Sequence, residues 1–278
     1  MSKIVFCTFG DKKWEKDVRR IYRQAKNFNL FDEFYIYNEN NITDENKKNI
    51  LDIMNVTKSD RGFGYWSWKS FIICDILSKL SDGDILFYSD SGSYLNYNAK
   101  DIFLDYINEA KKNDIFIFDL KAYSQTIRKW TKKITFDYFK NNIWDSKTPS
   151  DFDSLLNKEQ LEGGTIILVK NKYTVRIMNL WKELMSAKNH ILFDDETENE
   201  WSGFIESRHD QMVLTLILNC NHYSSVNTTV YSNDLRFMLK NIPVFTHMKY
   251  ALKNLFSLRN IITQFYSVLQ FIKLCLAL

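Results

Sequence analysis

Short apolar runs of β-forming residues alternate with longer segments of helical spacing in the first 118 residues. The apolar runs lie at 4–9, 33–37, 84–88 and 114–118. The segments between them have apolar residues three and four positions apart, as amphipathic helices do: 14–28, 69–80 and 101–111. This alternation predicts an α/β fold, a mostly parallel Rossmann-type sheet flanked by helices. Ligands of such sheets bind beyond the carboxyl ends of the strands.

The second half of the chain shows the same kinds of element less regularly. We expect a strand at 164–169 and helices at 175–185 and 210–218. An acidic stretch at 194–200 predicts a solvated loop. No repeat and no Pro/Gly/Ser-rich linker divides the chain, so residues 1–250 are expected to form one domain.

The tail, residues 251–278, has apolar residues at helical spacing with polar residues between them. Its polar positions leave no run of the roughly 20 apolar residues that cross a bilayer. We therefore predict an amphipathic helix lying on a membrane surface, with a basic polar face. A helix packed on the domain, or one that binds a partner, fits the same pattern.

Composition narrows the function classes. The net charge of +3 is too small for a nucleic-acid-binding face, although it is compatible with a phosphate-bearing ligand or an anionic membrane. The four cysteines form no CxxC pair and sit among apolar residues, so we expect free thiols in a reducing compartment. The N-terminus has no signal-peptide pattern, which predicts a cytoplasmic protein, peripheral at the inner face of the membrane through its tail.

Asp90 follows the apolar run that ends at Tyr88, and Ser91 and Gly92 come directly after it. A carboxylate at a strand end can hold a divalent cation that neutralises a diphosphate. A turn in which the Asp side chain caps the backbone accounts for the same residues equally well.

Residues 61–69, Arg-Gly-Phe-Gly-Tyr-Trp-Ser-Trp-Lys, combine two glycines, four aromatic rings and two cations in a chain with only eight glycines. Glycine permits close backbone approach to a ligand. Aromatic faces can stack on a base, and Arg or Lys can pair with phosphate oxygens. We favour a binding segment over an aromatic turn that only packs in the core.

Residues 206–211 end in Arg208, His209, Asp210 and Gln211, just before the apolar segment 212–218. Asp210 alone could be a helix cap. The four polar residues together favour a cluster that faces a ligand.

In order and type, these pieces resemble the GT-A glycosyltransferases, in particular bacterial surface-polysaccharide enzymes distantly similar to the glycogenin-like and Golgi initiating mannosyltransferase families. The match lies in 4–10, 61–69, 88–92 and 208–211, with weaker similarity at 130–132 and 162–164. The resemblance covers about residues 1–250. It implies a nucleotide-diphosphate sugar donor, a Mn²⁺ or Mg²⁺ ion, and transfer to a hydroxyl of a cell-surface glycan such as a capsule or lipooligosaccharide.

The resemblance also assigns roles to residues. Asp210 and His209 are the catalytic candidates. The donor-binding candidates are Thr8, Phe9, Arg61, Tyr65, Trp68, Lys69, Asp90, Ser91, Gly163 and Gln211. Trp130 and Lys132 are expected to contact the acceptor, and Asp90 and His247 to bind the metal.

One departure from the family pattern bears on the metal. The usual Asp-x-Asp signature has a second carboxylate where this chain has Gly92, and hard cations prefer several oxygen ligands. Either His247, Asp210 or water completes the shell, or cationic side chains act in place of a metal.

The sequence leaves the stereochemistry of transfer open. Inversion requires a base, for which Asp210 is the candidate, whereas in retention Asp210 would position the sugar. Because Gly92 weakens the metal motif, a catalytically silent subunit that binds a nucleotide sugar is the alternative function.

Overall fold

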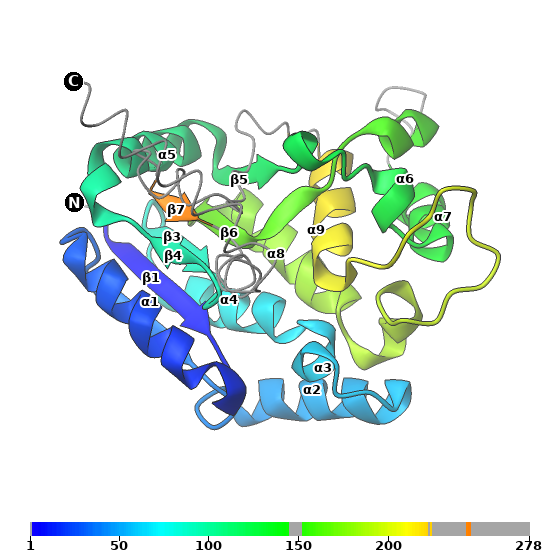
Figure 1. Cartoon of the computed structure of the whole chain (residues 1–278), viewed down its shortest axis with the longest axis horizontal. Helices are drawn as coiled ribbons and strands as arrows, with labels where there is room; N and C mark the ends of the chain where they lie inside the picture. The colour runs from blue at the N-terminus through cyan, green and yellow to red at the C-terminus, as the bar shows by residue number, and fades with distance from the viewer. Residues whose placement is uncertain (1, 145–151, 222, 224–242, 246–278) are drawn as a thin grey trace, which may run out of the picture.

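The computed structural model describes residues 2–144, 152–221, 223 and 243–245 (Figure 1). His247 and the tail at 251–278 lie outside the described residues. Among the described helices none is both long and apolar enough to span a bilayer.

The strands are β1 (Ile4–Phe9), β2 (Glu33–Tyr37), β3 (Ile85–Ser89), β4 (Tyr94–Leu95), β5 (Ile115–Asp119), β6 (Leu161–Val169) and β7 (Val244–Phe245). The α-helices are α1 (Glu15–Asn27), α2 (Asp44–Thr57), α3 (Gly62–Tyr65), α4 (Trp68–Lys79), α5 (Lys100–Asn113), α6 (Ile127–Trp130), α7 (Lys133–Asn142), α8 (Lys172–Leu184) and α9 (His209–Cys220). The 3₁₀ turns are η1 (Lys12–Trp14), η2 (Tyr97–Ala99), η3 (Lys121–Tyr123), η4 (Phe152–Asn157) and η5 (Ala187–Leu192).

Five strands form the central sheet in the order β2-β1-β3-β6-β5. β2 and β3 both pair parallel with β1, whereas β6 pairs antiparallel with β3 and with β5. All but β6 therefore run the same way, which confirms the α/β fold with a mostly parallel sheet. β4 and β7 form a separate two-stranded ladder.

Side chains alternate between two apolar cores, one on each face of the sheet. In β3, Leu86 and Tyr88 belong to the core that contains α4, α8 and α9, while Ile85 and Phe87 belong to the core that contains α1 and α5. This period-2 pattern in a fully buried strand explains why 85–88 is apolar throughout its length. Figure 1 shows α1 and α5 away from the side on which α8 and α9 lie.

The reversed direction of β6 positions the site. Because β6 is antiparallel, its first residues lie at the end of the sheet where β1, β3 and β5 have their last residues. Ser89, at the end of β3, is paired with Thr165, so Glu162, Gly163 and Gly164 lie beside Asp90. Side chains from both halves of the chain therefore lie together at the carboxyl end of the parallel strands.

Candidate active site

A cavity of about 730 Å³ lies at the carboxyl end of the parallel strands. Residues that follow β1, β3 and β5 line it, together with the start of β6, the segment around α3 and the start of α9. These residues fall within 9–14, 60–69, 90–93, 123–125, 162–164 and 206–211. The volume is typical of a site for a small molecule or cofactor.

Lys69, from the first turn of α4, joins the carboxylates at the centre of this cavity. Its ammonium nitrogen lies 2.8 Å from Asp210 Oδ2 and 3.5 Å from Asp90 Oδ1, and it donates to the Gly163 carbonyl at 2.9 Å. The Lys69 and Asp210 side chains are almost fully buried, whereas that of Asp90 is 30% exposed. Asp90 is therefore the most exposed member of this cluster, although Lys69 and Asp210 also line the cavity.

Burial and mutual charge set the ionisation of the cluster. Burial lowers the pKa of Lys69, but the carboxylates of Asp210 and Asp90 outweigh it, so the pKa is raised and the ammonium stays charged. Burial raises the pKa of Asp210 to about 6, with Lys69 opposing the rise. Burial, together with the charge of Asp90, raises the pKa of Glu162 to about 8. At neutral pH, Asp210 is thus mostly ionised and Glu162 mostly protonated.

Gly164 allows Asp90 and Glu162 to approach each other. Its amide donates to Glu162 Oε1 at 2.9 Å, and its carbonyl accepts from the Asp90 amide at 2.8 Å. A Cβ at position 164 would lie 2.6 Å from an oxygen of each carboxyl group. The buried Tyr88 hydroxyl donates to Asp90 Oδ1, which fixes the carboxylate from the sheet side.

Arg20, on α1, holds the loop that follows Asp90. Its guanidinium donates to the carbonyls of Ser91 at 2.7 Å and Ser93 at 2.6 Å, and lies over the Tyr94 ring at 3.6 Å. Backbone contacts of this kind leave the Ser91 hydroxyl and the Asp90 carboxylate in fixed places at the cavity wall.

The aromatic wall of the cavity is built on a left-handed turn. Five consecutive residues, 62–66, have positive φ angles, at 57°, 52°, 81°, 54° and 58°. Gly62 and Gly64 adopt this conformation freely, which accounts for the two glycines, whereas Phe63, Tyr65 and Trp66 are strained in it. Strain of this kind concentrates at functional sites.

The turn places flat rings against the end of β1. Phe9 stacks on Trp68 at 3.9 Å between ring centroids and on Phe63 at 6.0 Å. The Trp68 indole donates to the Gly62 carbonyl at 3.0 Å, which ties the stack to the turn. Phe9, Phe63, Trp66 and Trp68 all line the cavity.

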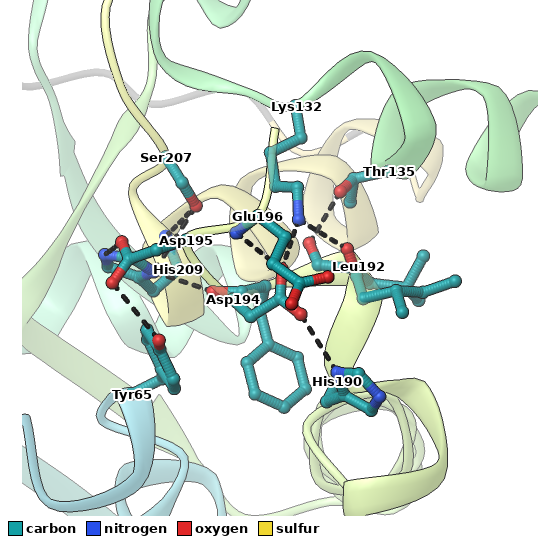
Figure 2. A network of polar contacts seen from close by, with 12 residues as sticks. Tyr65, Lys132, Thr135, His190, Leu192, Asp194, Asp195, Glu196, Ser207 and His209 are labelled. Atoms are coloured by element: carbon teal, nitrogen blue, oxygen red, sulfur yellow. Dashed lines mark hydrogen bonds and ion pairs between the residues drawn. The ribbon is translucent and has the colours of Figure 1, made fainter. Parts of the chain in front are cut away.

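A polar network holds the turn and the start of α9 together (Figure 2). Asp195 pairs with Arg61. It also accepts from the Tyr65 hydroxyl at 3.1 Å. The Nδ1–H of His209 donates to the Phe193 carbonyl at 2.6 Å, and the His209 ring stacks on Trp66. Burial lowers the pKa of His209 to about 4, so the imidazole is neutral at pH 7.

The neighbouring aspartate, Asp194, corrects two expectations. It is 1% exposed and pairs with the equally buried Lys132, and His190 also contacts it at 2.9 Å (Figure 2). The acidic stretch is therefore not wholly a solvated loop. Lys132 is also not at the cavity, because its ammonium is held by Asp194 and the Ile191 carbonyl.

The structure brings most of the predicted residues to the cavity. Those that line it are Phe9, Arg61, Trp68, Lys69, Asp90, Ser91, Gly163, His209, Asp210 and Gln211. Three more, besides Lys132, do not: Thr8 is buried within β1, Tyr65 is buried against Asp195, and Trp130 lies behind Arg208, whose guanidinium stacks on it at 4.1 Å. Direct ligand contact by these residues is not supported in this arrangement.

Among the lining residues, Tyr123 and Gln125 were not predicted. Glu162 and Arg208 lie in the segments 162–164 and 208–211 that carry the family resemblance, but neither was given a role of its own. For Glu162 the signal was present in the sequence, since an acid before two glycines inside an apolar strand is unusual in a chain with few glycines. For Tyr123 and Gln125 we find no local signal, because only the sheet order brings them to the cavity.

No protein-family model and no curated protein matches the sequence. The solved structures that the chain resembles include two with low sequence identity. A glycosyltransferase involved in glycosylation of the major capsid of PBCV-1 is 13% identical, with a TM-score of 0.34, covering 66% of each chain. Mouse xyloside xylosyltransferase 1 is 10% identical, with a TM-score of 0.42, covering 82% of this chain and 86% of its own. At these values the likeness adds no argument about the site, and the fold class rests on the sheet topology.

Proposed function

We propose that this protein is a glycosyltransferase that moves a sugar from a nucleotide-diphosphate donor to a hydroxyl of a cell-surface glycan. One observation carries the proposal: Asp90 and Asp210 are held by a single buried lysine midway along a cavity whose two ends differ in chemistry. A reactive centre between two unlike ends suits a transfer between two substrates.

The sheet order defines those two ends. Residues 9–14 lie at the end of β1, which is the second strand of the sheet. Tyr123 and Gln125 follow β5, which is the edge strand on the other side. Asp90 and Glu162 lie between them, after β3 and at the start of β6. The β1 end has the stacked rings and Arg61, which suit a nucleotide base and phosphates, so we place the donor there.

The charges of the lining residues bear on the proposed metal. Besides Glu162, the anionic residues that line the cavity are Asp11, Asp60, Asp90, Glu206 and Asp210, and the cationic ones are Lys13, Arg61, Lys69 and Arg208. With Glu162 protonated, these walls carry a net charge of −1, which does not by itself attract a diphosphate. A cation that arrives with the donor would offset this charge.

Asp90 fits such a cation. No three His, Cys, Asp or Glu side chains of the described residues form a metal site by themselves. Mg²⁺, however, is commonly held by one or two carboxylates together with substrate phosphate oxygens, and Asp90 offers a partly exposed carboxylate. A bound Mn²⁺ or Mg²⁺ would stabilise the negative charge of the leaving diphosphate.

In the proposed reaction, the bond between the anomeric carbon and the diphosphate oxygen breaks, and a bond from that carbon to the acceptor oxygen forms. In an inverting transfer, Asp210 takes the proton of the acceptor hydroxyl, and a pKa of about 6 suits a base at neutral pH. In a retaining transfer, the same carboxylate would position the sugar and the proton would leave with the diphosphate. His209, which is neutral and bonded to the Phe193 carbonyl, anchors the first turn of α9, on which Asp210 lies.

The test is nucleotide release from a panel of nucleotide-diphosphate sugars, with Mn²⁺, Mg²⁺ or EDTA. We expect slow release from at least one donor, reduced about 100-fold or more in Asp210→Asn. Asp82→Asn, an exposed aspartate in the turn that precedes β3, serves as the matched control. A donor that binds without any release would favour the silent binding subunit instead.

The membrane role of the tail is a separate part of the proposal. In the full chain, Phe265→Glu together with Leu269→Glu would place charge on the predicted apolar face, so binding to vesicles with anionic lipids should fall several-fold. Unchanged vesicle binding would rule out an anchoring role for the helix.

A further inference from the structure

The end of the cavity at β5 is polar and lies opposite the end to which we assign the donor. Tyr123 and Gln125 reach it from the turn after β5, and Glu206 and Arg208 reach it from the segment before α9. The Ile205 amide donates to the Lys129 carbonyl at 2.8 Å, which fastens that segment to α6. Asp210 lies two residues beyond Arg208 and lines the same cavity, so this end adjoins the central carboxylates.

Arg208 is held in a defined orientation at this end. Its guanidinium carbon lies 4.1 Å from the centroid of the Trp130 ring, and Glu206 Oε1 lies 3.3 Å from its Nη1. A planar cation resting on an indole keeps its N–H groups directed along its edge, where they can donate to oxygen atoms. Trp130 thus acts as a positioning residue, although it does not line the cavity.

The pairing of Arg208 with Glu206 bears on the charge of the ligand that this end can bind. The two side chains are 34% and 47% exposed, so both reach solvent in the cavity mouth. Side by side they offer one donor edge and one acceptor edge with no net charge. That combination suits two adjacent hydroxyl groups, whereas an anionic ligand would meet the carboxylate of Glu206.

We infer that the β5 end is the acceptor subsite and that it takes a neutral pyranose. Arg208 donates to one hydroxyl oxygen, Glu206 accepts from the adjacent hydroxyl, and the half-exposed Tyr123 ring packs on a face of the sugar. The subsite rests on the proposed function, since only a transferase needs a second sugar beside Asp210.

Direct binding tests the subsite without knowledge of the donor. The probes are the methyl glycosides of glucose, galactose and mannose, and methyl glucuronide as the anionic counterpart, titrated into the full chain by saturation-transfer NMR. We expect millimolar binding of at least one neutral glycoside. Glu206→Gln and Arg208→Lys should each raise its Kd about tenfold, because a neutral amide accepts from a hydroxyl more weakly than a carboxylate, and an ammonium lacks the planar donor edge that Trp130 supports.

Three variants sharpen the assignment. Trp130→Ala should weaken glycoside binding and Trp130→Phe should restore most of it, since a smaller ring still supports the guanidinium. Glu198→Gln, an exposed acid on the same segment, should leave the Kd unchanged. Thermal unfolding of each variant separates loss of binding from loss of the fold.

The outcomes separate the two proposals. The acceptor subsite is wrong if no neutral glycoside binds at tens of millimolar, if the glucuronide binds better, or if Glu206→Gln and Arg208→Lys bind as the unchanged chain does. Glycoside binding without nucleotide release from any donor would instead overturn the transferase. Release that glycosides accelerate, with that acceleration lost in Glu206→Gln, supports both.

Discussion

The two walls of the cavity are built in opposite ways. The wall with Asp90 and Glu162 stands on regular, fully buried strands, and its charges are held by Lys69, Tyr88 and Gly164. The aromatic wall stands on the left-handed turn at 62–66, where three non-glycine residues hold an unfavourable backbone conformation. The first wall depends on charge balance and close packing, and the second on conformational strain compensated by ring stacking.

Lys69→Met should give the largest effect, because it leaves two carboxylates near each other without their counter-charge. Breaking a buried ion pair by removing one partner costs about 3–5 kcal/mol. Urea unfolding measures the loss. Lys79→Met on the same helix breaks a partly exposed pair with Asp75, for which we expect less than about 1 kcal/mol. An equal loss of unfolding free energy in the two variants would show that the buried cluster depends on its lysine no more than an exposed ion pair does.

Gly164→Ala tests the packing of the same wall. A methyl group there meets an oxygen of Asp90 and of Glu162 at 2.6 Å, so we expect a loss of about 1–3 kcal/mol together with weakened donor binding. Gly163→Ala is the neighbouring control, since its Cβ would meet the Gln211 side chain at 3.2 Å and smaller shifts would accommodate it. Indistinguishable unfolding and donor affinity in the two variants would contradict the close approach of the carboxyl groups.

A substitution in the aromatic wall should lower the free energy of unfolding less than one in the charged wall. Gly64→Ala places an L-residue at a φ of 81° and costs about 1–2 kcal/mol, as one further residue in left-handed conformation. Loss of the ring stack should accompany it, visible as a change in near-ultraviolet circular dichroism from Trp66 and Trp68. A fully stable variant with an unchanged spectrum would mean that the turn is not left-handed.

The pH dependence tests the charged wall alone, and we expect it to give the smallest effect. Asp210 must be ionised to act as a base, so activity should fall as pH drops through about 6. Glu162 loses its proton as pH rises through about 8, and the added negative charge should weaken donor binding above that pH. Glu162→Gln should remove the alkaline fall and keep the acid one, measured as kcat/KM for nucleotide release. An alkaline fall that persists in Glu162→Gln would assign it to another group.

Sequence patterns predicted the parallel strands well, because their origin is local. The apolar runs at 84–88 and 114–118 end within a residue of β3 and β5, and Asp90 was expected at a strand tip. The strand expected at 164–169, in contrast, begins three residues later than β6. The antiparallel direction of β6 was not predicted, since the residue pattern of a strand is the same in both directions. Glu162 was therefore not chosen, although its neighbour Gly163 was.

Other misses arise from tertiary contacts. The helix α2 begins with the polar run 44–49, and its apolar residues are concentrated in its second half, so its periodicity is poor. Lys132 and Asp194 carry charges that favour the surface, and only their mutual pairing makes burial possible. The left-handed turn follows no helix or strand period, although the two glycines in 61–69 marked the segment as unusual.

The handedness of that turn has a consequence for chemistry on the chain itself. Positive φ is the natural preference of D-amino acids, so a synthetic chain with D-alanine at position 62 would suit the backbone, whereas its L-isomer would oppose it. Mirror-image substitution thus distinguishes a strained wall from a relaxed one, since a single D-residue within β3 would only disturb the sheet.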